Sequence, residues 1–297
     1  MPKRHVIIVG AGASGLAAAC AAAEAGAQVT VLEKNHVPGR KILSTGAGKC
    51  NFTNASVAPD RYHGGCAGFL DRVFSACPPE RVRGFFDELG LLSAADGEGR
   101  VFPRSMKAAD VANSLLNRMS ERGAALRVLT EVTGAERGPG GFTVSAVKVR
   151  PKWEKGGAQR GEPVSFSCDS LILACGGPAY PQIGGSDSGY ALARSLGHTA
   201  EPPRPALVPL KVRHSFVKQA AGVRLQTAAE LVSGGNVLAR SRGETLFTEY
   251  GVSGPAALEL SRTAVFALGT APAFLRLDLF PEYAGEALDA LLSRRRE

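Results

Sequence analysis

The sequence has few aromatic residues and no long run of apolar residues. Phe, Trp and Tyr make up 6% of its 297 residues, and they do not alternate with basic clusters as they do on base-stacking surfaces. No apolar run reaches the roughly 18 residues of a membrane-spanning helix. These absences argue against nucleic acid and a membrane as partners, so we expect a small-molecule substrate. The sequence carries no sign of a particular oligomeric state.

Metal-binding, disulfide and hydrolase patterns are also missing. The six cysteines form no C-x-x-C pair, and the five histidines have no metal-ligand spacing. Cysteines of this kind are typical of a reducing compartment, so we expect a cytoplasmic protein without a metal site. No G-x-S-x-G, H-E-x-x-H or P-loop motif occurs. The sequence therefore assigns no catalytic nucleophile, acid or base.

The composition is otherwise that of an ordinary globular protein. Hydrophobic residues make up 44% of the chain and charged residues 21%, and the length fits two domains of about 150 residues each. The net charge is +8, from 35 basic and 27 acidic residues, and the basic residues are scattered. We interpret this mild excess as serving, in part, the phosphate groups of a cofactor.

The first 33 residues carry the strongest pattern of the chain. Residues 6–9 predict a buried strand, and Gly10, Gly12 and Gly15 follow it directly with G-x-G-x-x-G spacing. An alanine-rich helix and a second strand come next, and that strand ends in Glu33, close to the expected distance of about 20 residues. The whole is typical of a dinucleotide-binding βαβ unit.

Each glycine has a separate physical role in this unit. Gly10 permits the tight turn, Gly12 lets a pyrophosphate approach the backbone, and Gly15 lets the helix pack on the strand. The start of the helix, at Ala13 and Ser14, offers free N–H groups and a positive dipole end to phosphates.

The acidic end of the second strand predicts the ribose contact. Glu33 can accept hydrogen bonds from a ribose diol and would repel a 2′-phosphate. Lys34, which follows it, is a further candidate for cofactor binding.

A second glycine-rich block, GRKILSTGAGKCNFTN, covers residues 39–54. Arg40, Lys41 and Lys49 give it positive charge, and several polar side chains surround one short turn. The block predicts a second contact on an extended anionic ligand, and the alternative is a solvated basic loop.

The elements expected after this block form a cofactor-domain pattern. They are helices within residues 69–90 and 108–122, extended residues 100–103, strands at 126–131, 142–149, 164–167 and 170–174, a turn at Gly134, and a helix at 188–197. The last strand ends in Cys175, Gly176 and Gly177. Because an open α/β sheet binds its ligand at the carboxyl ends of its strands, we expect these three residues to approach the same dinucleotide.

A proline-rich segment, EPPRPALVP at residues 201–209, predicts a domain boundary because proline blocks regular structure. We therefore expect a cofactor domain over residues 1–200 and a mainly β domain over residues 201–297. The elements expected in the second domain are strands at 210–212, 228–231, 236–239, 245–247 and 274–279, and a helix at 255–265 that Ser253 caps.

Several blocks together resemble a known family. GAGASGLAAA, GRKILSTGAGKCNFTN, LILACGGPAYPQIGGSDSGYALARSLGH and GETLFTEYGVSGPAALELS are similar to bacterial FAD-binding flavoproteins of the aminoacetone-oxidase or BaiN-like family. The resemblance implies FAD as cofactor. It implies an α/β fold class, with a Rossmann-like FAD-binding domain, an antiparallel β-meander and an inserted, mainly β second domain.

The resemblance also implies roles for residues outside the glycine turn. Lys49, Cys50 and Asn51, with Arg40 and Lys41, would line the stretch from the pyrophosphate to the flavin. Val132 would contact the adenine side through its backbone. Members of the family have a further C-terminal segment that contacts the flavin ring, and we find no such segment here, so we expect the second domain to be truncated.

The function expected from these observations is that of an FAD-dependent oxidoreductase, with flavin-mediated hydride or electron transfer on an unidentified small molecule. NAD(P)H is a candidate reductant, although a second G-x-G-x-x-G for it is absent. Two alternatives remain open: an NAD-binding dehydrogenase, and a non-catalytic or inactive flavoprotein fragment. An RNA-modifying flavoprotein is disfavoured because no concentrated basic face is predicted.

Overall fold

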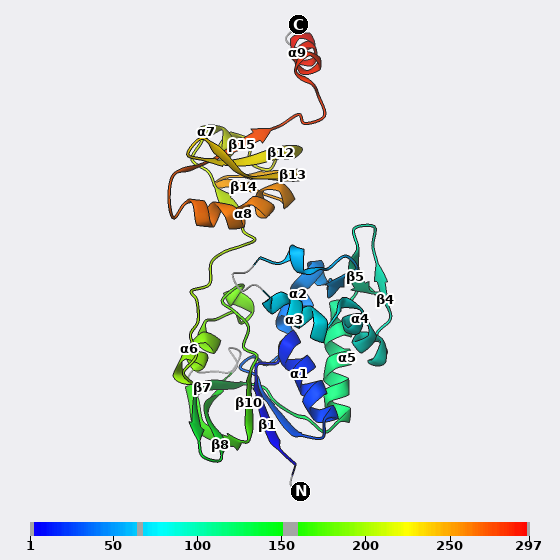
Figure 1. Cartoon of the computed structure of the whole chain (residues 1–297), viewed down its shortest axis with the longest axis vertical. Coiled ribbons are helices and arrows are strands. Elements are labelled where there is room, and N and C mark those ends of the chain that lie inside the picture. Colours follow the sequence, from blue (N-terminus) through cyan, green and yellow to red (C-terminus); the bar gives the residue numbers. More distant parts are fainter. Residues whose placement is uncertain (1–2, 64–67, 151–159, 296–297) are drawn as a thin grey trace. The chain divides into compact units, whose positions relative to one another are not determined.

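A computed structural model of the chain describes residues 3–63, 68–150 and 160–295. The chain divides into two compact units, Met1–Glu201 and Pro202–Glu297, and Figure 1 labels most of their helices and strands. Within the described part of the chain, no helix is long and apolar enough to cross a membrane.

The first unit is built on a four-stranded parallel sheet. Its strands are β1 (His5–Val9), β2 (Gln28–Leu32), β6 (Ala125–Arg127) and β10 (Ser170–Leu173), in the spatial order β10-β1-β2-β6. β1 pairs in parallel with both β2 and β10. The return strand β10 therefore ends beside the glycine turn that follows β1, although 160 residues of chain separate them.

The alternation of β1 side chains assigns the two faces of this sheet. Val6 and Ile8 pack with helices α1 (Ala13–Glu24) and α5 (Ala108–Glu121). Ile7 packs on the opposite face, with residues of the antiparallel meander and of α6. Because both faces are covered, the strand reads as a continuous apolar run, as expected for a parallel sheet.

Shorter elements surround this core. They are α2 (Arg40–Ser44), the 3₁₀ turns η1 (Thr45–Gly48), η2 (Pro59–Arg61) and η3 (Pro181–Ile183), α3 (Phe69–Ala76), α4 (Pro79–Glu88), α6 (Ser188–Ser195), and the small antiparallel sheet β3-β5-β4 with strands Thr53–Asn54, Arg100–Pro103 and Ser93–Ala95. α2 contacts α5 and η1, which places the basic block of residues 39–54 next to the first βαβ unit.

The antiparallel meander consists of β7 (Thr130–Gly138), β8 (Gly141–Val149) and β9 (Arg160–Cys168). The expectation of one strand over residues 126–131 is wrong, because β6 and β7 are separate strands in different sheets. Leu129 lies between them with a φ of +52°. The left-handed backbone at this residue redirects the chain from the central sheet into the meander.

The turn expected at Gly134 is also wrong. β7 continues through this residue to Gly138, and the pairing with β8 shifts in register between Val132 and Gly134. The glycine thus marks a β-bulge inside a strand rather than the end of one, which is the other common use of glycine in sheets.

The second unit is a five-stranded antiparallel sheet in the order β11-β14-β13-β12-β15. Its strands are β11 (Leu210–Lys211), β12 (Arg224–Ser233), β13 (Asn236–Thr248), β14 (Gly251–Ser253) and β15 (Ala273–Asp278), and its helices are α7 (Ser215–Gln219), α8 (Pro255–Ala267) and α9 (Gly285–Arg294). Leu260 of α8 is buried against Leu231 of β12. The mainly β composition of this unit agrees with the expected fold class.

Two local expectations for the second unit are wrong. The strands expected at 236–239 and 245–247 form one strand, β13, because its residues pair with β12 along almost its whole length. Ser253 does not cap α8; Gly254 occupies the N-cap position, and no described side chain donates or accepts a capping hydrogen bond there. Pro255 does occupy the first helical turn, as expected.

Candidate cofactor-binding site

The glycines of the first turn differ in what surrounds them. Gly10 has a φ of +104°, and a Cβ there would lie 2.5 Å from the carbonyl oxygen of Ala174. A Cβ on Gly15 would overlap the carbonyl oxygen of Gly10. By contrast, a Cβ on Gly12 would meet no described heavy atom within 4 Å. Gly10 and Gly15 therefore serve the packing of the fold, whereas Gly12 faces open space.

The start of α1 presents backbone donors at this open space. Among the described residues, no side chain caps the helix at Gly12. The first N–H groups of a helix have no partner inside it, so those at the start of α1 stay available, and Ala13 and Ser14 are exposed. This arrangement, with the positive end of the helix dipole, suits an anionic group.

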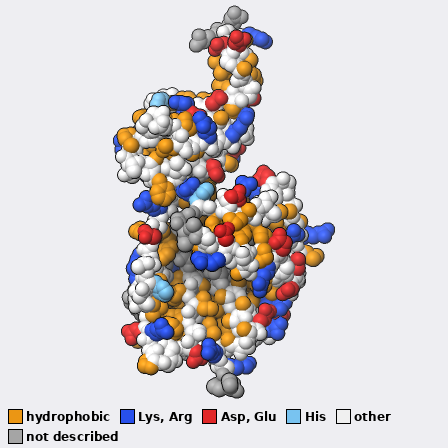
Figure 2. Space-filling view, in the orientation of Figure 1, with side chains coloured by type: hydrophobic (Ala, Val, Ile, Leu, Met, Phe, Trp, Pro, Cys, Tyr) orange, Lys and Arg blue, Asp and Glu red, His pale blue; other side chains and the backbone are white. Residues whose placement is uncertain are grey.

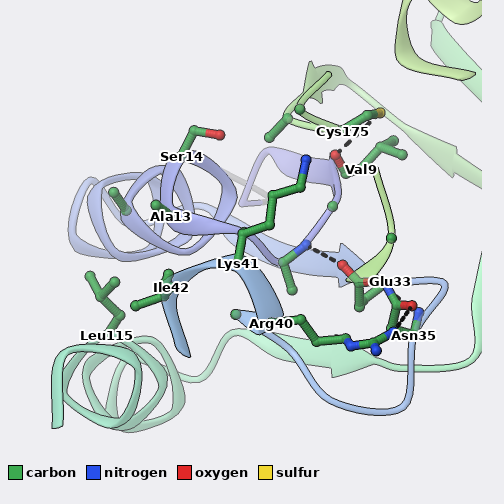
Figure 3. Close-up of a pocket in the computed structure, with 18 of the residues that line it drawn as sticks. Val9, Ala13, Ser14, Glu33, Asn35, Arg40, Lys41, Ile42, Leu115 and Cys175 are labelled. Atoms are coloured by element: carbon green, nitrogen blue, oxygen red, sulfur yellow. Dashed lines mark hydrogen bonds between the residues drawn. The ribbon is translucent and has the colours of Figure 1, made fainter. Parts of the chain in front are cut away.

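Glu33 lies at the carboxyl end of β2 and is 7% exposed. Its Oε2 accepts a hydrogen bond from the backbone N–H of Ala11 at 2.8 Å. Its Oε1 accepts two from Asn35, from the backbone N–H at 2.8 Å and from Nδ2 at 2.6 Å. Figure 3 shows the carboxylate between the glycine turn and Asn35. The buried charge is thus held by donors from both sides.

Two lysines of the first unit reach the segment that follows β10. Lys41 Nζ donates to the carbonyl oxygen of Gly177 at 3.1 Å, and Lys34 Nζ donates to Ser186 Oγ at 3.1 Å. Both acceptors are uncharged. Neither lysine takes part in an ion pair with a described residue, so their positive charge remains uncompensated.

Arg40 likewise donates to uncharged acceptors, but its side chain extends in another direction. Its guanidinium donates to Asn35 Oδ1 at 3.0 Å and to the carbonyl oxygen of Gln182 at 3.3 Å. In Figure 3, Lys41 extends from α2 toward the end of β10, whereas Arg40 extends toward Asn35. α2 therefore presents two cations on different sides of one space.

That space is a cavity of about 830 Å³. All but three of the residues expected to bind the cofactor line it: Gly10, Gly12, Ala13, Ser14, Glu33, Lys34, Arg40, Lys41, Cys50, Asn51, Val132, Cys175 and Gly176. The cavity also extends between helices into an apolar part, whose walls include Phe52, Val82, Phe85, Phe86 and Leu115.

The other three expected residues lie outside the cavity lining. Gly15 packs behind the glycine turn. Gly177 approaches the cavity only through its carbonyl oxygen, which binds Lys41. Lys49 is exposed just after η1, and its backbone N–H donates to Gly46. Of the basic residues expected here, Lys49 is the one that the structure places away from the others.

Cys50, Cys77 and Cys175 line the cavity, and two of them, Cys50 and Cys175, have a raised pKa. Burial raises the pKa of Cys50 and of Cys175 above the usual thiol value. Cys175 Sγ donates to the carbonyl oxygen of Val9 at 3.6 Å. A raised pKa disfavours the reactive thiolate, so neither side chain is prepared to act as a nucleophile.

The sequence interpretation missed Asn35, Thr130 and Ser186, which also line the cavity. Asn35 had one usable signal, since it comes two residues after the acid that ends β2. The position of Ser186 depends on the path of the chain after β10, which no local pattern fixes.

The parallel sheet, the glycine turn and the meander define a Rossmann-like α/β protein. A family model described as the HI0933-like protein Rossmann domain matches residues 4–257. The chain belongs to this HI0933-like family. The match confirms the expected fold class and the resemblance to a family of bacterial FAD-binding flavoproteins.

Two curated relatives and one solved structure illustrate the likeness. The chain is 40% identical over 279 residues to the 3-dehydro-bile acid delta(4,6)-reductase of Clostridium scindens, which covers 93% of this chain and 64% of that protein. It is 31% identical over 257 residues to the ribosomal RNA dihydrouridine synthase of Haemophilus influenzae, covering 86% and 60%. The chain thus spans about three-fifths of the length of these relatives.

Among solved structures, the 3-ketosteroid-delta4-(5alpha)-dehydrogenase of Rhodococcus jostii RHA1 is similar, with a TM-score of 0.46 and 14% identity. The match covers 78% of this chain and 60% of the dehydrogenase. A likeness of this size carries no argument about function.

Proposed function

We propose that the chain binds FAD and belongs to an oxidoreductase. The observation that carries the proposal is the single cavity on which the glycine turn, the carboxylate of Glu33 and the cations of α2 converge. The adenosine diphosphate half would lie at the start of α1, with a ribose hydroxyl on Glu33. The uncompensated charges of Arg40 and Lys41 would face the pyrophosphate.

The shape of the cavity suits FAD in three respects. Its volume of about 830 Å³ falls within the range of about 300–1,000 Å³ typical of ligand sites. The open space at Gly12 allows a phosphate to reach the backbone. The apolar residues of its wall, among them Phe85, Phe86 and Leu115, offer apolar surface to a flat aromatic ring.

FAD, when bound, supplies hydride and electron transfer. The chain's own residues bind the nucleotide, orient it through Glu33 and the start of α1, and cover part of it with apolar side chains. We propose a small organic molecule as substrate. The name of the 40% identical relative, a bile acid reductase, supports reduction as the direction. NAD(P)H stays our candidate reductant.

The rRNA-modifying relative suggests another substrate class, but the face drawn in Figure 2 does not favour it. On the face drawn in Figure 2, Lys and Arg side chains are dispersed among Asp and Glu side chains. A nucleic-acid surface needs basic residues concentrated along the path of the phosphates. We therefore keep a small molecule as the proposed substrate.

The visible absorption spectrum of the purified protein tests the proposal. We expect flavin absorbance bands in protein purified without added flavin, and FAD in the supernatant after denaturation. A colourless protein that binds NAD and excludes FAD would favour an NAD-binding dehydrogenase instead. A colourless protein that binds neither would favour a non-catalytic relative.

If flavin is present, the reductant can be identified in the same sample. Mixed anaerobically with NADH or NADPH, the protein should lose its flavin absorbance with at least one of them. Retention of the absorbance with both would exclude nicotinamide as reductant while leaving FAD binding intact.

A further inference from the structure

Asn35 occupies a central position among the polar side chains of the cavity. Its Nδ2 donates to Glu33 Oε1 at 2.6 Å, and its Oδ1 accepts from Arg40 Nη1 at 3.0 Å. The residue therefore connects the buried carboxylate to one of the α2 cations. Removing the Asn35 side chain would take one hydrogen bond from the Glu33 carboxylate and one from the Arg40 guanidinium.

The fold makes room for this amide. A Cβ on Gly184, which has a φ of +102°, would lie 2.7 Å from Asn35 Nδ2. The backbone oxygen of Asn35 accepts a hydrogen bond from Leu129, which starts the turn into β7. One distant segment thus holds the backbone of Asn35, and another packs against its side-chain amide.

The hydrogen bonds that Glu33 accepts occupy most of the acceptor positions of its carboxylate. A carboxylate has about four acceptor positions. Asn35 takes two of them on Oε1, and Ala11 takes one on Oε2. One acceptor position therefore remains, on Oε2, so this carboxylate has room for one ribose hydroxyl and not for both.

We propose that Asn35 is a positioning residue, whose side-chain amide orients Glu33 so that the carboxylate binds a single ribose hydroxyl of the nucleotide. The proposal rests on the proposed dinucleotide site and adds the residue that sets its selectivity. Because Asn35 acts through Glu33, removing its side chain changes which ribose hydroxyls contribute to the binding affinity. It does not only change the affinity for the nucleotide as a whole.

The test compares the binding of ADP, 2′-deoxy-ADP and 3′-deoxy-ADP by isothermal titration calorimetry to protein from which any bound flavin has been removed. In the unmodified protein, we expect one deoxy analogue to bind about tenfold more weakly than ADP and the other within about twofold, as the loss of one hydrogen bond to a charged group predicts. In Asn35→Ala, the difference between the two analogues should fall to about twofold or less.

Two further variants separate positioning from stability. Asn35→Asp keeps an acceptor for Arg40 and the backbone donor to Glu33, but it replaces the side-chain donor with a second carboxylate, so it should lose the discrimination as well. Asn117→Ala, the same truncation at an exposed position of α5, should retain it. Circular dichroism establishes that each variant is folded.

The possible outcomes are distinct. Discrimination that persists in both Asn35 variants would overturn the proposal, as would equal losses with both deoxy analogues in the unmodified protein. Failure of the unmodified protein to bind any of the three nucleotides would instead overturn the proposed dinucleotide site, and this inference with it.

Discussion

At the scale of single residues, the three glycines of the first turn have different tasks. The space at Gly12 is open and its backbone is extended, with a φ of −83°. Gly15 faces the carbonyl oxygen of Gly10 without room for another atom. One motif therefore combines a position that the proposed cofactor requires with a position that the fold requires.

This difference predicts opposite effects of the same substitution. Gly12→Ala should leave the free energy of unfolding within about 0.5 kcal/mol of its original value but weaken FAD binding at least about tenfold, because the new methyl group occupies the space of a phosphate. Gly15→Ala should destabilise the fold by about 1–3 kcal/mol through overpacking. Urea unfolding and FAD titration measure the two effects, and equal destabilisation by both variants would contradict the assignment.

Two thiols of the cavity wall, the buried Cys50 and the half-buried Cys175, give a second prediction at this scale. Since burial raises the pKa of Cys50 and Cys175, both should react with iodoacetamide at pH 8 at least about tenfold more slowly than the exposed Cys77. Peptide mass mapping of a time course measures the rates. Equal rates for Cys175 and Cys77 would contradict the burial of Cys175.

The same thiols set the sign of a pH effect on stability. Their folded pKa is raised, whereas in the unfolded chain the pKa is about 8.5. As the pH rises above that value, the unfolded state loses protons first, so the contribution of these thiols to stability is complete below it and decreases above it.

At the scale of elements, α2 holds the cations that reach across the cavity. Lys41→Met removes a charge that faces the proposed pyrophosphate, so FAD binding should weaken by about ten- to a hundredfold, from about 1.5–3 kcal/mol for a charged hydrogen bond. Lys49→Met removes the same charge from a neighbouring exposed position and should change the affinity less than about twofold. Similar losses in both variants would show that the basic block acts only through its overall charge.

The elements also show how far local patterns predict this fold. The first strand, helix and second strand were predictable because three signals indicate the same βαβ unit within 33 residues. These signals are the hydrophobic periodicity, the glycine spacing and the acid at the end of the second strand. α2 has only five residues and is too short to show a helical period. The separation of β6 from β7 depends on the left-handed conformation of Leu129, and leucine gives no signal for such a conformation.

The predicted site residues show the same dependence on local sequence patterns. Most of those next to a strand end or a glycine turn line the cavity, because strand topology brings them together, whereas Gly15 and Gly177 do not. Asn35 was missed because its role depends on Gly184, which approaches it from a distant part of the chain. Lys49 was included on its charge and on the family resemblance, but it is exposed and is not among the residues that line the cavity.

At the scale of the whole molecule, the described residues that line the cavity all lie between Val9 and Leu192, within the first unit. FAD at a hundred times its dissociation constant should stabilise the folded state that binds it by about 2.7 kcal/mol. In hydrogen–deuterium exchange, protection should therefore increase at the glycine turn and α2, and remain unchanged in β12 and β13. Increased protection confined to the second unit would contradict the location of the site.

The central claim is that the first βαβ unit and α2 form an FAD site, and equilibrium dialysis of the purified protein against FAD measures it most directly. We predict saturable binding of one FAD per chain, with a large loss of affinity in Gly12→Ala at unchanged stability. Absence of saturable binding, or an affinity that Gly12→Ala leaves unchanged, would contradict the account.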